Sequence, residues 1–387
     1  MKRMILIKKE NVMKRMILIA SVLGAVLSLG HALAQSPNFD DPAAMAKQKA
    51  ELTAIVANPS APIYLQHVGT AIVDTSKYKK TGPWTICFSN AAVNNPWRVV
   101  GFKNMQAQVA VDKAKIKDFI VTDAGGSDDK QIADINDMLT GGKCDIMLIA
   151  PNTTAALTPV VEKACGVLPV IVFDRGVTTT CPVTFLHPVG GYGYGIAAAQ
   201  FIIDNVPKGG NVLALRILPG VDVLETRFSA AKHLLGEAGL KIVGVEFTGA
   251  DNAKTKSIVA DYIQKGKIDA IFMDAGATAV AAIEAFEDAG LPVPVITGED
   301  QQDFLQKWKS VGFKGIAPTY PTFQWRTAIL AAEKILSGES VPGPQWVLPQ
   351  PSITKDVLDK YINTAMPPLH YAMCGCEDFP DYPNRWK

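Results

Sequence analysis

The chain has 387 residues, of which 48% are hydrophobic and 19% charged, and its formal net charge is +1. This length suffices for two domains of ordinary size. The near-zero charge argues against a nucleic-acid partner, because a phosphate-binding surface needs clustered Lys and Arg.

Residues 1–34 have the pattern of an export signal. A basic start at Met13 precedes an apolar stretch too short to span a bilayer, and Ala32-Leu33-Ala34 fits a small-residue cleavage site. We therefore expect cleavage after Ala34 and a soluble periplasmic product. The alternatives are an uncleaved anchor or a lipoprotein, although no cysteine follows the apolar stretch. The repeat of Met1–Ile7 as Met13–Ile19 leaves open whether Met1 or Met13 is the true start.

An alternation of strand and helix patterns begins after a polar N-terminal arm at residues 35–81. Strands are predicted over residues 84–89, 118–122, 145–150 and 168–173. Helices are predicted between them, over residues 97–113, after the N-cap Ser127, and from Asn152 or Thr153 to 164. Strand, helix and strand at this spacing predict a parallel sheet.

The same pattern then starts again. Strands are predicted over residues 211–217, 241–247, 269–273 and 293–297, with helices over 223–238, 254–266 and 277–289. Two rounds of one pattern predict two similar α/β lobes rather than one large sheet. A further strand over 315–320 and a helix over 322–337 could return to the first lobe. Several crossings of the chain would then form a hinge and a cleft.

Two other stretches carry weaker signals. The glycine cluster at residues 187–195 does not match the dinucleotide-binding pattern G-x-G-x-x-G, and we interpret it as flexible backbone at a lobe crossing. Residues 339–387 are rich in Pro, aromatic residues and Cys. They predict a short helix over 354–362, followed by a tail wrapped on the surface.

The six cysteines fit an oxidising compartment. Cys87 lies within a strand pattern and is predicted to be a buried free thiol. The sequence does not determine the pairing of the others, which are Cys144, Cys165, Cys181, Cys374 and Cys376. Because Cys374-Gly-Cys376 is not C-x-x-C, a structural role in the tail is favoured over thioredoxin-like redox chemistry.

The strongest functional signal is the stretch Leu168–Gly176. Its apolar, mostly β-branched residues predict a strand buried on both faces, and this strand ends in Asp174 and Arg175. Ligands of open α/β sheets bind outside the carboxyl ends of the strands. The pair therefore predicts a ligand site, and the alternative interpretation is a surface salt bridge.

Three features together resemble the sugar-binding periplasmic proteins of the ribose-binding type, which serve bacterial ABC importers. They are Asn94-Asn95-Pro96-Trp97 after the strand at 85–89, the Asp174-Arg175 strand end, and Arg227 in a helix after a strand. The resemblance covers about residues 82–349. It implies an α/β fold of two Rossmann-like lobes joined by a three-stranded hinge, with the ligand cleft between the lobes.

By analogy with this family, the chain divides into five parts. They are the signal peptide (1–34), the N-terminal arm (35–81), the first lobe (82–188 plus 321–349), the second lobe (189–320) and a C-terminal extension (350–387).

The resemblance also implies a set of ligand-binding residues, namely Asn95, Trp97, Asp174, Arg175, Arg227, Asp274, Glu299 and Tyr320. Asn95 would hydrogen-bond a sugar hydroxyl, and Trp97 would stack on the apolar face of the sugar. Asp174 and Arg175 would grip adjacent hydroxyls, and Arg227 would reach the ring oxygen or another hydroxyl. Asp274, Glu299 and Tyr320, and Arg98 in place of a second aromatic residue, depart from the pattern of the ribose binders. Ribose itself is therefore not predicted.

We expect a monomeric periplasmic receptor that captures a monosaccharide or polyol by lobe closure and delivers it to an ABC transporter permease. No catalytic residue, metal or cofactor is predicted. One alternative is a chemotaxis or signal-molecule receptor on the same fold. Another is a periplasmic carbohydrate-active enzyme that uses Asp174 and Glu299 as a carboxylate pair. A transcriptional regulator would need a DNA-binding helix pair where this chain has its leader.

Overall fold

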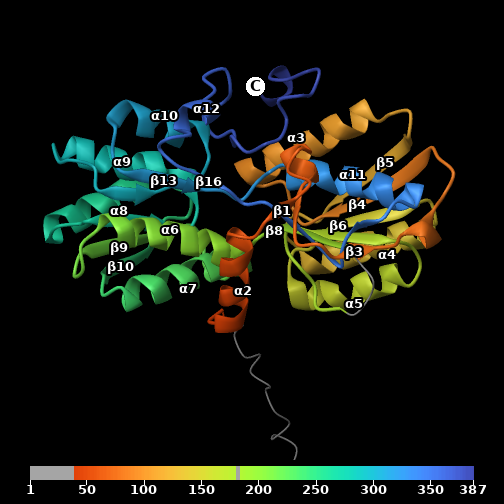
Figure 1. The fold of residues 1–387 in the computed structure, drawn as a ribbon, viewed down its shortest axis with the longest axis horizontal. Coiled ribbons are helices and arrows are strands. Elements are labelled where there is room, and N and C mark those ends of the chain that lie inside the picture. The colour runs from red at the N-terminus through yellow and green to blue at the C-terminus, as the bar shows by residue number, and fades with distance from the viewer. Residues whose placement is uncertain (1–38, 180–183) are drawn as a thin grey trace, which may run out of the picture. The chain divides into compact units, whose positions relative to one another are not determined.

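The computed structural model describes residues 39–179 and 184–387. The predicted export signal and Cys181 lie outside the described residues. Two large sheets, each flanked by helices, form the two lobes of the described chain (Figure 1), and this confirms the predicted α/β fold of two lobes. The nine strands predicted from the sequence are all present, with ends displaced by at most two residues.

The first sheet has eight strands in the order β1-β2-β15-β8-β7-β6-β4-β5. The six neighbouring strands β15, β8, β7, β6, β4 and β5 run parallel to one another. Strand β2 is antiparallel to β15, and β1 is antiparallel to β2. The strands are β1 (Val56–Ala57), β2 (His67–Val68), β4 (Trp84–Asn90), β5 (Ile116–Asp123), β6 (Ile146–Ala150), β7 (Val170–Phe173), β8 (Thr184–Pro188) and β15 (Gln345–Leu348). Two strands of the N-terminal arm thus extend this sheet.

Helices cover both faces of the first sheet. Helices α3 (Pro96–Val111) and α11 (Gln324–Ser337) pack on one face through Met105 and Trp325. Helices α4 (Asp128–Gly141) and α5 (Thr154–Cys165) pack on the other face through residues such as Ile135, Leu157 and Val161. The central strands β4, β6 and β7 are buried on both faces, as their continuous apolar runs predict.

The second sheet has six strands in the order β10-β9-β11-β12-β13-β16, of which only β16 is antiparallel. The strands are β9 (Asn211–Arg216), β10 (Lys241–Phe247), β11 (Ala270–Met273), β12 (Val295–Thr297), β13 (Gly315–Pro318) and β16 (Ser352–Ile353). The helices are α6 (Gly191–Asn205), α7 (Asp222–Glu237), α8 (Asn252–Lys265), α9 (Ala279–Asp288) and α10 (Gln302–Val311). Helices α6 and α7 cover one face, and α8, α9 and α10 cover the other. Helix α10 was not predicted from the sequence.

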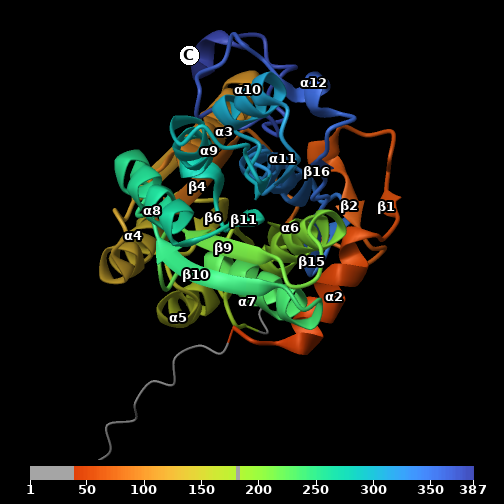
Figure 2. The ribbon, with the colours of Figure 1, turned by 90° about the vertical axis from the view of Figure 1, so that its left-hand side faces the viewer.

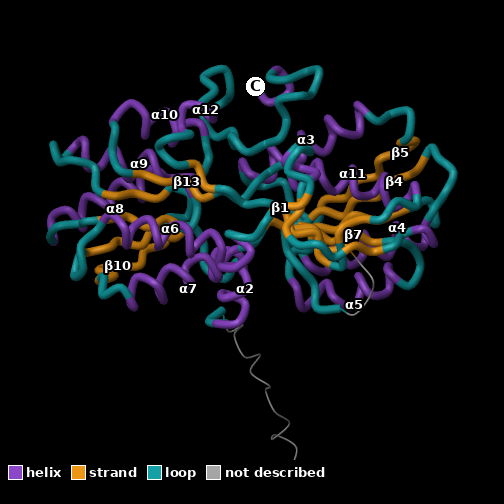
Figure 3. The backbone as a smooth tube through the Cα atoms, in the orientation of Figure 1, coloured by secondary structure: helices purple, strands orange, loops and turns teal. Residues whose placement is uncertain are grey.

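Within residues 39–179 and 184–387 the chain crosses between the two lobes three times. It passes from β8 to α6 after Pro188, from β13 to α11 after Pro318, and from β15 to β16 after Leu348. Figure 3 shows these connections as loops between the two groups of strands. Three such crossings agree with the predicted hinge.

The glycine cluster at the first crossing has a packing role. A Cβ atom at Gly191 would lie 2.0 Å from Thr226 Oγ1, and one at Gly195 would lie 2.1 Å from the carbonyl oxygen of Arg227. The two glycines therefore let α6 approach α7 closely. This close packing fixes the backbone that carries Arg227.

The N-terminal arm and the C-terminal tail pack against the lobes. Helix α2 (Pro42–Leu52) lies next to α6, where Met45 packs on Tyr192 and Ile196 (Figure 2). Strand β3 (Ile72–Val73) of the arm pairs with β14 (Val341–Pro342). Short 3₁₀ turns occupy Ile63–Leu65, Ser76–Tyr78, Gly276–Thr278 and Asn384–Trp386.

The C-terminal tail differs from the prediction. Its helix α12 is confined to Leu358–Tyr361. Cys374, Cys376 and Trp386 are at most 3% exposed, so the tail is not merely wrapped on the surface. Proline and turn composition had predicted irregular backbone correctly but could not indicate burial.

The prediction of a free thiol at Cys87 is wrong. Cys87 forms a disulfide with Cys144, and their Cα atoms lie 5.6 Å apart. The physical reason is that β4 and β6 are neighbours in the sheet, and Cys144 lies just before β6. A second disulfide joins Cys374 to Cys376, and Cys165 is also disulfide-bonded. Among the described residues, no helix has the length and apolar character needed to cross a membrane.

Candidate functional site

The first-lobe part of the candidate site lies at the carboxyl end of β7. Asp174 follows this strand with a φ of 67°, in the left-handed region that non-glycine residues occupy only at an energetic cost of about 1–3 kcal/mol. Its Oδ2 accepts a hydrogen bond from Arg98 Nη2 at 2.6 Å. Arg98 and Asp174 are only 4% and 7% exposed, so the two side chains form a buried ion pair within the first lobe.

Arg175 has a different environment from Asp174. Its Nη1 donates to the carbonyl oxygen of Asn152, and its Nε has no hydrogen-bond partner within the described part of the chain. A buried donor without a partner costs about 1–3 kcal/mol. Arg175 therefore retains a donor that a ligand could satisfy.

The second-lobe part of the candidate site is built around Arg227. Its Nη1 donates to Glu299 Oε1 at 2.8 Å and to the carbonyl oxygen of Asp274 at 2.7 Å. The guanidinium lies 4.0 Å from the ring centroid of Tyr194 and 5.1 Å from that of Tyr320. Arg227 and Glu299 are each 3% exposed, so this lobe also holds a buried ion pair.

Asp274 lies at the end of β11 behind this pair. Its carboxylate accepts from the backbone amide of Ile217 at 2.8 Å and from Arg216 Nε at 3.1 Å. Burial raises the pKa of Asp274 to about 7, and Arg216 and Arg227 oppose this rise. The Asp274 carboxylate therefore holds Arg216 and the backbone of Ile217, and its carbonyl oxygen holds the Arg227 guanidinium.

Tyr320, at the second crossing, connects the two parts. Its hydroxyl donates to the carbonyl oxygen of Asp174 at 3.2 Å, and its own carbonyl accepts from Trp97 Nε1 at 2.7 Å. The rings of Trp97 and Tyr320 lie 5.6 Å apart. With the contact between Tyr320 and Arg227, these interactions bring side chains of both lobes together.

Asn95 lies away from this group. It is exposed, and its Oδ1 caps helix α3 by accepting from the backbone amide of Arg98 at 3.0 Å. The structure thus brings seven of the eight predicted residues together around Tyr320 and leaves Asn95 at the start of α3. The predicted sugar contact of Asn95 stays a prediction.

A cavity of about 290 Å³ lies beside Tyr320, with walls from both lobes and from α2. Its lining residues are Ala44, Lys47, Gln48, Glu51, Thr154, Asp174, Arg175, Gly176, Phe185, His187, Val189, Gly190, Gly191, Asp222, Val223, Thr226, Tyr320 and Gln345. Three predicted residues, Asp174, Arg175 and Tyr320, therefore line it. Ligand pockets usually measure about 300–1,000 Å³, so the cavity suits a small solute.

The described residues contain one group with the composition of a metal site. Donor atoms of His370, Cys374 and Cys376 all lie within 4.8 Å of one another. The disulfide between Cys374 and Cys376 occupies both sulfurs, whereas a cysteine binds metal as a thiolate. In this state the group is a structural part of the tail.

Two residues of the site were missed as functional candidates. Arg98 was noticed only as a departure from the aromatic pattern, and a buried partner for Asp174 would have been the signal to look for. Tyr371 lies in the tail and donates from its hydroxyl to Glu299 Oε2 at 3.3 Å. No local pattern predicts a contact between positions 72 residues apart.

Asp300, next to Glu299, makes the stability of the folded protein depend on pH. Its Oδ2 accepts from the backbone amide of Met373 at 2.6 Å, and its Oδ1 has no partner among the described residues. Burial raises the pKa of Asp300 to about 7, and the nearby Glu299 adds to the rise. An unfolded aspartate has a pKa of about 3.9, so between pH 4 and 7 the folded state holds a proton that the unfolded chain has lost.

We therefore expect the contribution of Asp300 to stability to be full below about pH 4 and to be lost as the pH rises towards 7. Each pH unit changes it by at most about 1.4 kcal/mol. Because Asp274 and Glu333 also have raised pKa values, the measurement compares the parent with Asp300→Asn. Urea unfolding at pH 5 and pH 7.5 should show a smaller loss of stability in the variant. An identical pH dependence would contradict the assignment.

Comparisons with known proteins agree with this geometry. A family model described as a periplasmic binding protein domain matches residues 86–340. The ribose import binding protein of Bacillus subtilis strain 168 is 28% identical over 260 residues, which cover 67% of this chain and 83% of the relative. The corresponding protein of Haemophilus influenzae is 25% identical over 259 residues, which cover 66% and 87%.

Two solved structures extend the comparison to the fold. An ABC transporter solute-binding protein from Thermobispora bispora aligns with a TM-score of 0.64 and 24% identity, covering 75% of this chain and 90% of that chain. A Bacillus halodurans solute-binding protein with bound myo-inositol aligns with a TM-score of 0.63 and 17% identity, covering 73% and 98%. At these identities the likeness shows the fold. Together with the family match over residues 86–340, the two sheets and their crossings show that the chain belongs to the periplasmic binding protein domain family.

Proposed function

We propose that this protein is an extracytoplasmic receptor that captures a monosaccharide or polyol between its lobes and delivers it to the permease of an ABC importer. The observation that carries the proposal is the cavity beside Tyr320, which Asp174 and Arg175 line at the carboxyl end of β7. Ligands of open α/β sheets bind at this position. Relatives named as ribose import binding proteins and a neighbour with bound myo-inositol support a polyhydroxylated ligand.

The two buried ion pairs beside the cleft suit a neutral solute. Arg98 is paired with Asp174, and Arg227 is paired with Glu299, each within its own lobe. Since each pair is already neutral overall, neither pair by itself attracts a charged ligand, and the cation left over among the predicted residues is Arg175, which has no carboxylate partner among the described ion pairs. A sugar hydroxyl can donate to a carboxylate and accept from a guanidinium, so it can join such a pair without separating it.

Within this proposal the predicted residues differ in how they would meet the solute. Asp174, Arg175 and Tyr320 would contact the solute directly. Arg227, Asp274 and Glu299 would form the polar surface that the second lobe presents on closure. Trp97 would cover an apolar face of the solute, as the resemblance implies. Its indole nitrogen already binds the backbone of Tyr320, which would hold the ring in place.

Capture by lobe closure follows from the three crossings. Solute binding favours the closed form only by its higher affinity for that form. The closed form would then be recognised by the membrane permease. Export through the predicted leader at residues 1–34 would place the receptor in the periplasm. There we expect it to act as a monomer.

We infer that the protein is a receptor rather than an enzyme. The two carboxylates that a glycosidase would need, Asp174 and Glu299, are each held by a guanidinium within 2.8 Å. The carboxyl groups of a glycosidase must be free to exchange a proton with the substrate or with water, whereas these two carboxylates each accept a hydrogen bond from an arginine. The pairs are therefore suited to holding hydroxyl groups.

A thermal-shift screen tests the proposed function. Pentoses, hexoses and polyols would be added to the parent protein and to Arg175→Ala, and we expect at least one solute to raise the melting temperature of the parent. Stabilisation by a ligand at 100 times its dissociation constant is about 2.7 kcal/mol. The variant should melt near the parent without solute and lose most of the shift, because Arg175 contributes a free donor but no ion pair. A parent that responds to no solute, or a variant that responds fully, would contradict the proposal.

A further inference from the structure

The C-terminal extension is joined to the second lobe near the polar group around Arg227. Tyr371 forms an isolated antiparallel bridge with Gln301. The amide of Ala372 donates to the carbonyl oxygen of Asp300 at 2.7 Å, and the amide of Met373 donates to the Asp300 carboxylate at 2.6 Å. The backbone of this segment is thus fixed directly beside Glu299.

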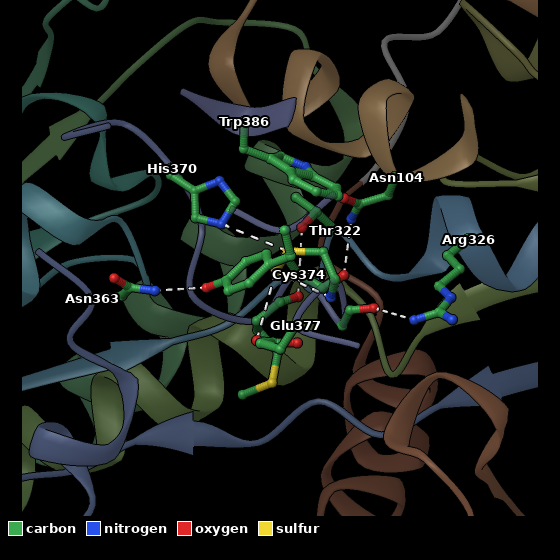
Figure 4. The surroundings of a disulfide bond; sticks show 12 residues. Asn104, Thr322, Arg326, Asn363, His370, Cys374, Glu377 and Trp386 are labelled. Carbon is green, nitrogen blue, oxygen red and sulfur yellow. Dashed lines mark hydrogen bonds between the residues drawn. A yellow bond between two sulfur atoms is a disulfide. The ribbon is translucent and has the colours of Figure 1, made fainter. Parts of the chain in front are cut away.

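The next residues of the extension are joined to the first lobe. Asn104 Nδ2, on α3, donates to the carbonyl oxygen of Cys374 at 2.9 Å, and Trp386 Nε1 donates to Asn104 Oδ1 at 2.8 Å. Arg326 Nη1, on α11, donates to the carbonyl oxygen of Gly375 at 2.6 Å. Figure 4 shows Asn104, Trp386 and His370 around Cys374. The extension therefore passes from one lobe to the other between Met373 and Cys374.

The position of this segment is fixed by its contacts on both sides. Figures 1 and 3 show the chain after α12 running in loops from the side of α10 to the side of α3. The disulfide between Cys374 and Cys376 closes the turn where it changes lobes. The side chain that precedes this turn, Tyr371, is consequently held in one place.

The hydroxyl of Tyr371 completes a chain of hydrogen bonds that ends on Arg227. It accepts from Gln301 Nε2 at 3.1 Å and donates to Glu299 Oε2 at 3.3 Å. The other carboxylate oxygen of Glu299 accepts from Arg227 at 2.8 Å. Tyr371 is 4% exposed. Burial and the neighbouring carboxylates keep the pKa of Tyr371 well above its usual range, so its hydroxyl keeps its proton.

We propose that Tyr371 is a positioning residue of the solute site, through which the C-terminal extension holds Glu299 and hence Arg227 in the orientation that the solute meets. This inference rests on the proposed function of the cleft. Without the hydroxyl, the partner left to Glu299 Oε2 among the described residues is the amide of Gly276, at 3.2 Å. The carboxylate could then rotate, and the guanidinium that faces Tyr320 would lose its fixed direction. The extension lies beyond the family match at residues 86–340.

The test compares three tail variants by calorimetric titration with the solute found in the thermal-shift screen. Tyr371→Phe removes the hydroxyl and keeps the ring, whereas Tyr371→Ala removes both. Tyr382→Phe is the matched control, because its hydroxyl accepts from Asn363 Nδ2 at 2.7 Å and does not reach Glu299. The melting temperature without solute is measured for each variant.

We expect Tyr371→Phe to weaken solute binding about 10-fold, the effect of one hydrogen bond to a charged group. Its melting temperature without solute should stay close to that of Tyr382→Phe, which should bind within about 2-fold of the parent. If Tyr371→Phe binds the solute as tightly as the parent, the proposal is overturned, because the hydroxyl then has no role. A weaker affinity of Tyr371→Ala would in that case come from loss of the ring. The parent is titrated first. If it binds no solute, the proposed function fails before any tail variant is compared, and the inference fails with it.

Discussion

Replacement of Arg227 with methionine is expected to lower the free energy of unfolding by about 3–5 kcal/mol and to abolish solute binding. The variant would leave Glu299 as a buried carboxylate without a cation, and removal of one partner from a buried ion pair costs about this much. The carbonyl oxygen of Asp274 would lose a donor as well. Urea unfolding and calorimetric titration measure the two effects separately.

A second substitution shows whether the loss comes from the uncompensated charge. Glu299→Gln added to Arg227→Met removes that charge, so the double variant should recover part of the stability but none of the binding. The control is Arg385→Met, because the pair of Arg385 with Asp381 is partly exposed and such pairs contribute about 0–1 kcal/mol. A loss of stability in Arg227→Met no larger than in Arg385→Met would contradict the assignment of a buried pair.

Replacement of Asp174 with alanine should have an effect of similar size in the first lobe, lowering the free energy of unfolding by about 3–5 kcal/mol and abolishing binding. Arg98 is 4% exposed, and without Asp174 its remaining acceptors are Asn90 Oδ1 and the carbonyl oxygen of Ala92, at 3.3 and 3.4 Å. Alanine would also be placed at a φ of 67°, where a side chain other than Asn or Asp is unfavourable.

Arg175→Ala is the matched comparison for Asp174→Ala. The two residues are adjacent and line the same cavity, but Arg175 has no carboxylate partner among the described ion pairs. We expect it to lose binding with a change in stability below about 1 kcal/mol. Equal stability of the two variants would show that the pair between Arg98 and Asp174 does not form in solution.

The sequence predicted the parts of this site that depend on local pattern. Buried strands have continuous apolar runs, and the residue after such a run lies at the carboxyl end of the sheet. Asp174 was found in this way, since it directly follows β7, whereas Asp274 and Glu299 were implied by the resemblance to the sugar-binding family. The two rounds of strand and helix predicted two lobes for the same reason.

The sequence could not predict contacts that depend on the packing of distant segments. The pair of Arg98 and Asp174 joins positions 76 residues apart, and the bond between Tyr371 and Glu299 joins positions 72 residues apart. Cys87 was taken for a free thiol because its strand pattern indicates burial but not the neighbouring strand. Helix α10 was missed although its buried Phe304, Leu305 and Trp308 have helical spacing.

A crystal structure of the protein with the best solute from the screen tests the central proposal most directly. We predict the solute in the cavity beside Tyr320, with its hydroxyls within hydrogen-bond distance of Asp174 and Arg175 and the second lobe in contact with its other side. Electron density for the solute on an outer surface, with this cavity holding only water, would contradict the account.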